Sequence, residues 1–208
     1  MDEKVLLKFE AIADGLAGHG IAVVDFFLSD AEVSNIVNTD EFENSLLRFR
    51  KAGIGKMGKR QVNEGIRGDY IQWVDKDTAP GAVKLYLERL SQLSTFLNQA
   101  LFLSLKDLEV HMTTYPAGSF YKRHLDQFKH DDHRKLSVIC YLNEHWMEAE
   151  GGQLRVYQAD GPKDFFPHAG RLVCFRSDLL EHEVLPATRE RLSLTGWLLD
   201  QKIEIGNL

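Results

Sequence analysis

The sequence contains little cysteine and no long apolar run. Its 208 residues include two cysteines, Cys140 and Cys174, each inside an apolar segment typical of a β-strand. They provide neither a disulfide framework nor a paired-cysteine zinc site, so we expect two reduced, buried thiols. No apolar stretch reaches the length of a membrane span, and the N-terminus lacks the apolar core of a signal peptide. The sequence therefore predicts a soluble protein of a reducing cytoplasm, with no membrane partner.

An excess of positive charge is also absent. The formal net charge is -6, whereas proteins that bind nucleic acids present a basic surface to phosphates. We therefore expect no nucleic-acid partner. The 44% of hydrophobic residues is ordinary for a soluble globular protein, and the length suffices for a core of good size. We expect one domain over residues 1–208.

The first half of the chain, residues 1–107, has helical character. Apolar residues recur with helical spacing over residues 3–17 and after Pro80, which suits the first turn of a long helix. Ser29 and Glu32 have the spacing of a capping box, which predicts a further helix from residue 29 that resumes towards Leu47. Short strands are predicted at 21–27 and 70–74.

Residues 48–68 form a basic, glycine-rich segment. Seven lysines and arginines stand there against one acidic residue, with five glycines between them. Such a composition is typical of a flexible surface segment. One interpretation is a solvated loop, and the other is a mobile lid that grips a substrate. The residues alone leave both open.

From residue 108 onward the pattern changes to short strands separated by Gly, Pro, Asp or Asn. The strand-like segments are 109–115, 120–126, 136–143, 153–157, 171–176, 181–185 and 191–199. Helices followed by a run of strands predict an α+β fold in which residues 108–200 form a sandwich or barrel.

One pair of residues suggests a metal ion. His124 and Asp126 lie two positions apart in a predicted strand, which would place both on one face. Alone, such a pair is usually a feature of the surface. A third ligand would complete a two-histidine, one-carboxylate site with open positions for substrates and oxygen. His182 is the candidate, because strands far apart in sequence meet at the mouth of a jelly-roll barrel.

A second group of residues suggests a receptor for an acid. Arg191 and Ser193 share one face of the last predicted strand, and a guanidinium grips a carboxylate with two parallel hydrogen bonds. Tyr141 could add a phenol to this receptor. A metal with an acid receptor beside it suits a cosubstrate that chelates the metal at one end and carries a carboxylate at the other.

The pattern His124-x-Asp126, His182 and Arg191-x-Ser193 resembles that of the 2-oxoglutarate and Fe(II)-dependent oxygenases. Within that family the chain is most similar to the prolyl hydroxylases of the oxygen-sensing branch, the hypoxia-inducible-factor prolyl hydroxylase-like enzymes, and to their bacterial members. The resemblance covers residues 50–199 and rests on six ordered blocks: IRGDYIQW, YPAGSFYKRHLD, CYLNEHW, GGQLRVY, HEV and RERLSLTGW. It implies a double-stranded β-helix, or jelly-roll, core buttressed by N-terminal helices.

The resemblance also implies roles for individual residues. The Fe(II) ligands would be His124, Asp126 and His182. The 2-oxoglutarate site would comprise Arg191, Tyr141 and Ser193 at its far carboxylate, Tyr115 near the metal, and the apolar walls Ile139, Leu154, Val184 and Trp197. The target protein would meet the basic loop, the charged pair Arg67 and Asp69 at its base, and Trp73.

The implied activity is hydroxylation of a prolyl C4 in a target protein, with consumption of 2-oxoglutarate and O2, release of succinate and CO2, and ascorbate as an optional reductant. Bacterial members of the branch are associated with a proline of elongation factor Tu, which makes that GTPase the candidate partner. Three alternatives stay open: the same chemistry on a small molecule, a non-catalytic metal-binding jelly-roll, and a nucleic-acid demethylase. The basic loop disfavours a small-molecule substrate, and the acid receptor residue Arg191 disfavours a non-catalytic protein. The negative net charge disfavours a nucleic-acid demethylase.

Overall fold

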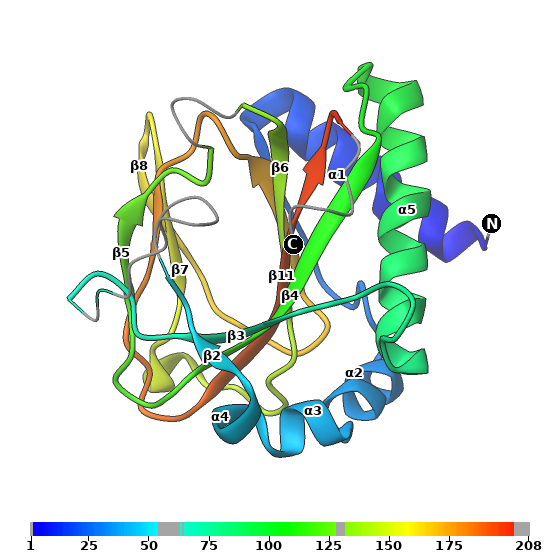
Figure 1. Cartoon of the computed structure of the whole chain (residues 1–208). Coiled ribbons are helices and arrows are strands. Elements are labelled where there is room, and N and C mark those ends of the chain that lie inside the picture. The colour runs from blue at the N-terminus through cyan, green and yellow to red at the C-terminus, as the bar shows by residue number, and fades with distance from the viewer. Residues whose placement is uncertain (1, 54–62, 64, 128–131, 202–208) are drawn as a thin grey trace.

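The computed structural model describes residues 2–53, 63, 65–127 and 132–201. The centre of the predicted basic loop, residues 54–62 and 64, lies outside the described residues. Two antiparallel sheets face each other, and helices cover the outer face of the larger one (Figure 1). Figure 1 shows the smaller sheet at the left and the long helix α5 at the right.

The larger sheet has the strand order β1-β9-β6-β11-β4-β3-β2, and the smaller sheet has the order β5-β10-β7-β8. The larger sheet comprises β1 (Ile21–Val24), β2 (Arg50–Lys51), β3 (Tyr70–Trp73), β4 (Asp107–Tyr115), β6 (Arg134–Tyr141), β9 (Leu172–Arg176) and β11 (Arg191–Leu199). The smaller sheet comprises β5 (Tyr121–His124), β7 (Leu154–Gln158), β8 (Gly161–Phe165) and β10 (His182–Val184). Several neighbours in the sheets, such as β4 and β11 or β5 and β10, are distant in sequence, as the predicted jelly-roll requires.

The helices are α1 (Glu3–His19), α2 (Asp30–Val37), α3 (Asp40–Glu43), α4 (Ser45–Arg48), α5 (Gly81–Leu101) and the short 3-10 turn Glu148–Glu150. The predicted apolar stripe of α5 is buried against α1 and the larger sheet, since Val83, Leu90 and Leu97 are inaccessible to solvent. Pro80 caps this helix instead of lying inside its first turn. No helix in the described ranges is long and apolar enough to cross a membrane.

The capping box predicted at Ser29 is present and also links two helices. The Ser29 amide donates to the Glu32 carboxylate at 2.7 Å, and the Glu32 amide donates to the Ser29 hydroxyl at 3.3 Å. Arg89 of α5 forms an ion pair with Glu32 at 2.6 Å. This ion pair and hydrogen bond, with help from Ser29, lower the pKa of Glu32 to about 2 against the opposing effect of burial.

The structure differs from the predictions at several places, including strand β2 inside the predicted basic loop and strand β1, which ends at Val24. Strand β8 was not predicted, because Gly161 and Pro162 mark turns; proline is tolerated there since β8 lies at a sheet edge. Strand β5 ends at His124 instead of reaching Asp126. The helical pattern towards Leu47 forms two single turns, α3 and α4, in place of one continuing helix.

A second apolar core fills the space between the two sheets. Its buried members are Ile21, Tyr115, Ile139, Tyr141, Leu154, Val156, Val173, Phe175 and Val184. The two cysteines instead face the helical layer, where both are buried and unpaired as predicted. Burial raises the pKa of Cys174 to about 12, so this thiol is not a nucleophile at neutral pH.

Candidate metal centre and acid receptor

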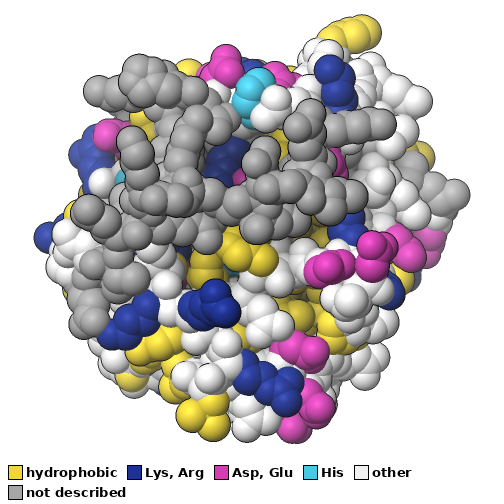
Figure 2. Space-filling view, in the orientation of Figure 1, with side chains coloured by type: hydrophobic (Ala, Val, Ile, Leu, Met, Phe, Trp, Pro, Cys, Tyr) yellow, Lys and Arg dark blue, Asp and Glu magenta, His cyan; other side chains and the backbone are white. Residues whose placement is uncertain are grey.

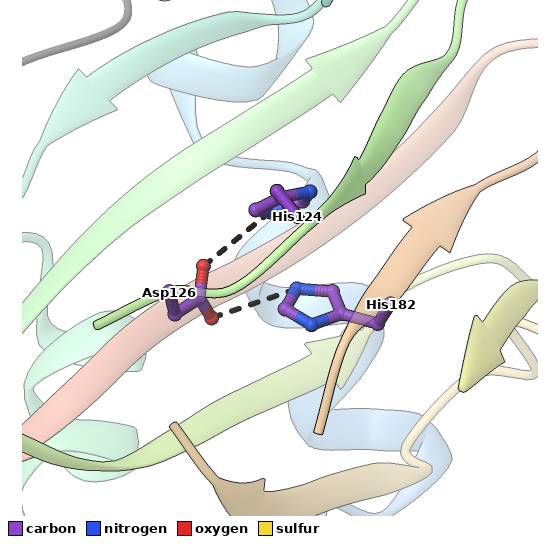
Figure 3. A group of neighbouring side chains, drawn as sticks. All are labelled: His124, Asp126 and His182. Carbon is purple, nitrogen blue, oxygen red and sulfur yellow. Dashed lines mark ion pairs between the residues drawn. The ribbon is translucent and has the colours of Figure 1, made fainter. Parts of the chain in front are cut away.

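Three side chains point towards one another beside strands β5 and β10 of the smaller sheet: those of His124, Asp126 and His182 (Figure 3). Each offers one ligand atom, and these atoms lie within 4.8 Å of one another. His124 Nε2 is 3.5 Å from Asp126 Oδ1, and His182 Nε2 is 3.6 Å from Asp126 Oδ2. Within the described residues this is the one group of three or more His, Cys, Asp or Glu side chains arranged to hold a metal ion.

The two histidines are oriented by their strands and by their own backbone. His182 of β10 lies directly opposite His124 of β5 in the antiparallel ladder. The Nδ1 of His124 donates to the Lys122 carbonyl at 2.7 Å, and the Nδ1 of His182 donates to the Leu180 carbonyl at 3.1 Å. With the proton on Nδ1, each Nε2 keeps its lone pair for a metal.

The protonation states also suit a cation. Burial lowers the pKa of His182 to about 4, so its imidazole is neutral at pH 7. Burial alone would raise the pKa of Asp126, but His182, His124 and the Ser137 hydroxyl together lower it. Carboxylate oxygens and imidazole nitrogens are ligands of Fe(II) and related divalent ions.

The predicted acid receptor lies between the sheets and is buried. Arg191 is 2% exposed and Tyr141 is fully buried. The guanidinium carbon of Arg191 lies 4.9 Å from the centre of the Tyr141 ring and 5.1 Å from that of Tyr115. Arg191 Nη2 and Tyr141 Oη are buried without a hydrogen-bond partner among the described residues. A buried donor without a partner costs folding free energy, and a ligand that carries acceptor atoms would satisfy both donors.

Gly152 holds this arginine in place. Its carbonyl accepts a hydrogen bond from Arg191 Nε at 2.9 Å. Gly152 has φ +71°, and a Cβ there would lie 2.9 Å from side-chain atoms of Trp146 and Ala187. Only glycine suits such a position. Ser193, which faces Tyr141 across the ladder, shares a hydrogen bond with Thr195 at 3.2 Å.

The predicted apolar walls fall into two places. Ile139, Leu154 and Val184 lie in the core between the sheets together with Tyr141. Trp197 instead packs against Trp73, with ring centres 6.3 Å apart, and against His111 at 5.6 Å. The structure therefore groups Trp197 with a residue that we predicted at the target-protein surface.

Arg67 and Asp69 form the predicted charged pair. Arg67 Nε and Nη2 donate to the two Asp69 carboxylate oxygens at 2.7 and 2.6 Å, and the Asp69 side chain is fully buried. The Arg67 guanidinium lies 4.2 Å from the Tyr121 ring centre, and the Tyr121 ring stacks on His124 at 3.6 Å. The base of the basic loop is thus stacked, through one aromatic ring, on a proposed metal ligand.

Three comparisons with known proteins agree on the family. Residues 110–199 match the family model described as the 2OG-Fe(II) oxygenase superfamily. A solved prolyl-4-hydroxylase from Pseudomonas putida is 42% identical, with a TM-score of 0.84, over 93% of this chain and all of that one. The chain belongs to the 2OG-Fe(II) oxygenase superfamily.

Two animal proteins are further relatives of this oxygenase. A Caenorhabditis elegans hypoxia-inducible factor prolyl hydroxylase is 31% identical over 96% of the chain, but the chain spans only 30% of that protein. A Trichoplax adhaerens prolyl hydroxylase, solved with a hypoxia-inducible factor peptide, is 26% identical with a TM-score of 0.81, over 95% of this chain and 91% of that one.

The cofactors of this family are Fe(II), 2-oxoglutarate and O2, and the oxygenase has residues that fit them. The converging nitrogens and oxygens of the histidines and Asp126 suit Fe(II). The unpartnered Arg191 Nη2 and Tyr141 Oη suit the far carboxylate of 2-oxoglutarate. When bound, the metal and the 2-oxo acid supply the activation of O2.

Sequence reasoning missed several residues that contact the predicted site. Ser137 donates to Asp126 Oδ2 at 2.6 Å, Tyr121 stacks on His124, and the Arg134 guanidinium lies 3.5 Å from the Trp197 ring centre. Tyr121, three residues before His124, was within reach of a local search. Ser137 and Arg134 were not, since their partners are distant in sequence.

Proposed function

We propose that this chain is an Fe(II)- and 2-oxoglutarate-dependent dioxygenase that hydroxylates C4 of a prolyl residue in a target protein. 2-Oxoglutarate would be converted to succinate and CO2 in the same turnover. The observation that carries the proposal is the coexistence of a three-ligand metal site with two buried, unpartnered donors on Arg191 and Tyr141. The 42% identity to a prolyl-4-hydroxylase over its full length supports the choice of proline.

In this proposal His124, Asp126 and His182 hold Fe(II). Arg191 binds the far carboxylate of 2-oxoglutarate through its charge, and its burial keeps water from competing. Tyr141 donates a hydrogen bond to the same carboxylate. Burial raises the pKa of its phenol above the ordinary value, so the hydroxyl keeps its proton.

The remaining contacts of 2-oxoglutarate would be supplied by neighbours of the receptor. Tyr115 lies beside Arg191, and Ser193 extends the polar end of the pocket. Ile139, Leu154 and Val184 would form the apolar walls, and Trp197 would extend them on the side of Trp73. An apolar, dry pocket strengthens each charged hydrogen bond inside it.

The target protein would dock where the basic loop ends. Arg67 and Trp73 are the proposed contact residues, and the buried Asp69 would act by holding Arg67. Tyr121 joins Arg67 to His124 by stacking. The animal relative of known structure was solved with a peptide of its target, which supports a protein segment as substrate here.

We propose elongation factor Tu as the target, on the resemblance of the chain to bacterial members of the branch. The reaction would take place in the cytoplasm, which suits the two unpaired, buried thiols. The alternative substrate is a small molecule. A nucleic acid suits the surface less well, since basic and acidic side chains are interspersed over the described part of the face in Figure 2.

The test combines purified protein, Fe(II), 2-oxoglutarate and O2 with elongation factor Tu or a panel of candidate proteins. Succinate release and a gain of one oxygen on a proline, detected by mass spectrometry, are the expected results. His182→Ala should abolish both, because it removes a metal ligand. His133→Ala is the matched control: His133 lies in the loop before β6 and pairs with Asp200 at 2.9 Å, outside the site.

Each arm of this test has a separate meaning. Turnover of 2-oxoglutarate with small molecules alone would replace the protein substrate by a metabolite. Metal and 2-oxoglutarate binding without turnover on any partner would favour the non-catalytic jelly-roll. Equal loss of activity in His182→Ala and His133→Ala would indicate misfolding and would remove the support for the metal site.

A further inference from the structure

The metal ligands are not held equally by the secondary structure. His124 and His182 lie opposite each other in paired strands, and each is oriented by its Nδ1 hydrogen bond to a backbone carbonyl. Asp126 lies beyond the end of β5, in a bend. A ladder therefore orients two ligands, and the third needs another source of order.

Two buried serines supply that order. Ser137 Oγ lies 2.6 Å from Asp126 Oδ2, within the range of a hydrogen bond between a hydroxyl and a carboxylate. Ser137 Oγ also lies 2.9 Å from Ser177 Oγ. Ser177 is inaccessible to solvent and Ser137 is 1% exposed. The three groups form one chain that ends at a metal ligand.

The direction of the protons in this chain follows from the chemistry of the groups. The ionised Asp126 carboxylate has no proton to donate, so Ser137 donates to Oδ2. A hydroxyl carries one proton, so Ser177 must donate to Ser137. Each hydrogen bond then polarises the next, which strengthens the contact with the carboxylate.

Both serines are fixed to the centre of the larger sheet. Ser137 lies in β6, paired with Phe175 of β9 on one side and Trp197 of β11 on the other. The amide of Ser177 donates to the Lys135 carbonyl at 3.1 Å, and its own carbonyl accepts from the Gln127 amide at 3.2 Å. The bend that carries Asp126 is therefore tied to the same rigid strands as the serines.

We propose that Ser137, supported by Ser177, is a positioning residue that orients the Asp126 carboxylate towards the metal site. Its hydroxyl holds Oδ2 in a carboxylate whose Oδ1 lies 3.5 Å from His124 Nε2 and whose Oδ2 lies 3.6 Å from His182 Nε2. The serine chain thus gives Asp126 the fixed orientation that the paired strands give to the two histidines.

This inference rests on the metal site of the proposed function, and its test does not require turnover. Mn(II) and Co(II) would be titrated without oxygen into the wild-type chain and four variants. Ser137→Ala should weaken metal binding by about 10-fold to 100-fold, as loss of a partner of a ligand does. Ser177→Ala should weaken it less, because Ser137 still donates to Asp126. Ser137→Thr, which restores a hydroxyl, should recover the affinity.

The fourth variant, Thr114→Val, is the matched control. Thr114 carries another fully buried hydroxyl of the larger sheet, without a hydrogen-bond partner in the described ranges and among residues that face the helical layer. It should bind metal as the wild type does. The visible spectrum of bound Co(II) is a second readout, since it depends on the number and arrangement of the ligands; it should change in Ser137→Ala and stay as in the wild type in Thr114→Val.

Several outcomes would overturn the inference. Wild-type Mn(II) affinity and an unchanged Co(II) spectrum in Ser137→Ala would remove the role of the serine. If Ser137→Ala does not fold, the same result in Ser177→Ala would count against it. A wild-type chain that binds no metal would overturn this inference and the proposed function together. Metal binding with the expected serine effects but without proline hydroxylation would overturn the proposed function alone.

Discussion

Replacing Tyr141 by phenylalanine should change stability and cosubstrate affinity in opposite directions. The Tyr141 hydroxyl is buried, and no residue in the described part of the chain forms a hydrogen bond with it. An unsatisfied buried polar group costs about 1–3 kcal/mol of folding free energy. Tyr141→Phe removes that cost and keeps the ring, so the metal-free protein should gain about 1 kcal/mol of unfolding free energy.

The same change should weaken 2-oxoglutarate binding. A hydrogen bond to a charged group contributes about 1.5–3 kcal/mol, and each 1.4 kcal/mol corresponds to a factor of ten in affinity. The Kd for 2-oxoglutarate should therefore rise by about 10-fold to 100-fold in Tyr141→Phe. The remaining affinity comes from Arg191, which the substitution leaves in place.

The assay pairs urea denaturation of the metal-free protein with anaerobic 2-oxoglutarate titration of the Mn(II)-loaded protein. Tyr86→Phe is the matched control, because Tyr86 is also fully buried and its hydroxyl also lacks a partner, but it lies in the core beneath the helices. It should gain similar stability at unchanged cosubstrate affinity. An unchanged Kd in Tyr141→Phe, or an equal rise in both variants, would refute the assignment of this phenol to the receptor.

Three further predictions concern stability, each measured by urea denaturation. Arg67→Ala leaves the fully buried Asp69 carboxylate without its ion pair and should cost about 3–5 kcal/mol of unfolding free energy. The double variant Arg67→Ala, Asp69→Ala should regain much of that loss, whereas additive losses from the two substitutions would contradict this reasoning. The pKa of Glu32 falls from 4.5 to about 2 on folding, so the stability that this carboxylate contributes is complete above pH 4.5 and is lost as the pH falls towards 2. Glu32→Gln should cost about 1–2 kcal/mol of unfolding free energy at pH 7, since the pair with Arg89 is partly exposed, and nothing near pH 2. Burial lowers the pKa of His111 from 6.5 to about 3, so the unfolded state binds a proton at higher pH than the folded state does. Stability should therefore decline as the pH falls below 6.5, by about 3 kcal/mol at pH 4. His111→Asn should lack this part of the decline, and a pH profile identical to that of the wild type would argue against a neutral, buried imidazole.

Local structure could be predicted from the sequence where it depends on a single interaction between residues close together in the chain. The Ser29 and Glu32 spacing predicted a capping box because both partners lie within one helical turn. The stripe of α5 predicted its buried face because helix periodicity acts within the helix itself. The hydrogen bond that His111 shares with Thr113, two positions away at 2.7 Å, is a contact of the same short range.

The predicted strand from residue 120 to Asp126 shows where such reasoning ends. Alternating side chains mark a strand but do not show where its partner stops. Strand β10 begins at His182, which lies directly opposite His124, so the ladder has no partner for the residues that follow His124. Asp126 reaches the site from a bend, and Ser137 of a different sheet orients it.

The sequence by itself determined the chemistry of the site. Few residue types bind a divalent metal or grip a carboxylate, so His124, Asp126, His182 and Arg191 were recognisable from their identity and spacing. Only the tertiary structure decided how those residues are held: the Tyr121 stack on His124, the Gly152 carbonyl on Arg191, and the serine chain on Asp126. These contacts join segments that alternation and spacing leave unrelated, because their positions depend on how two sheets close on one core.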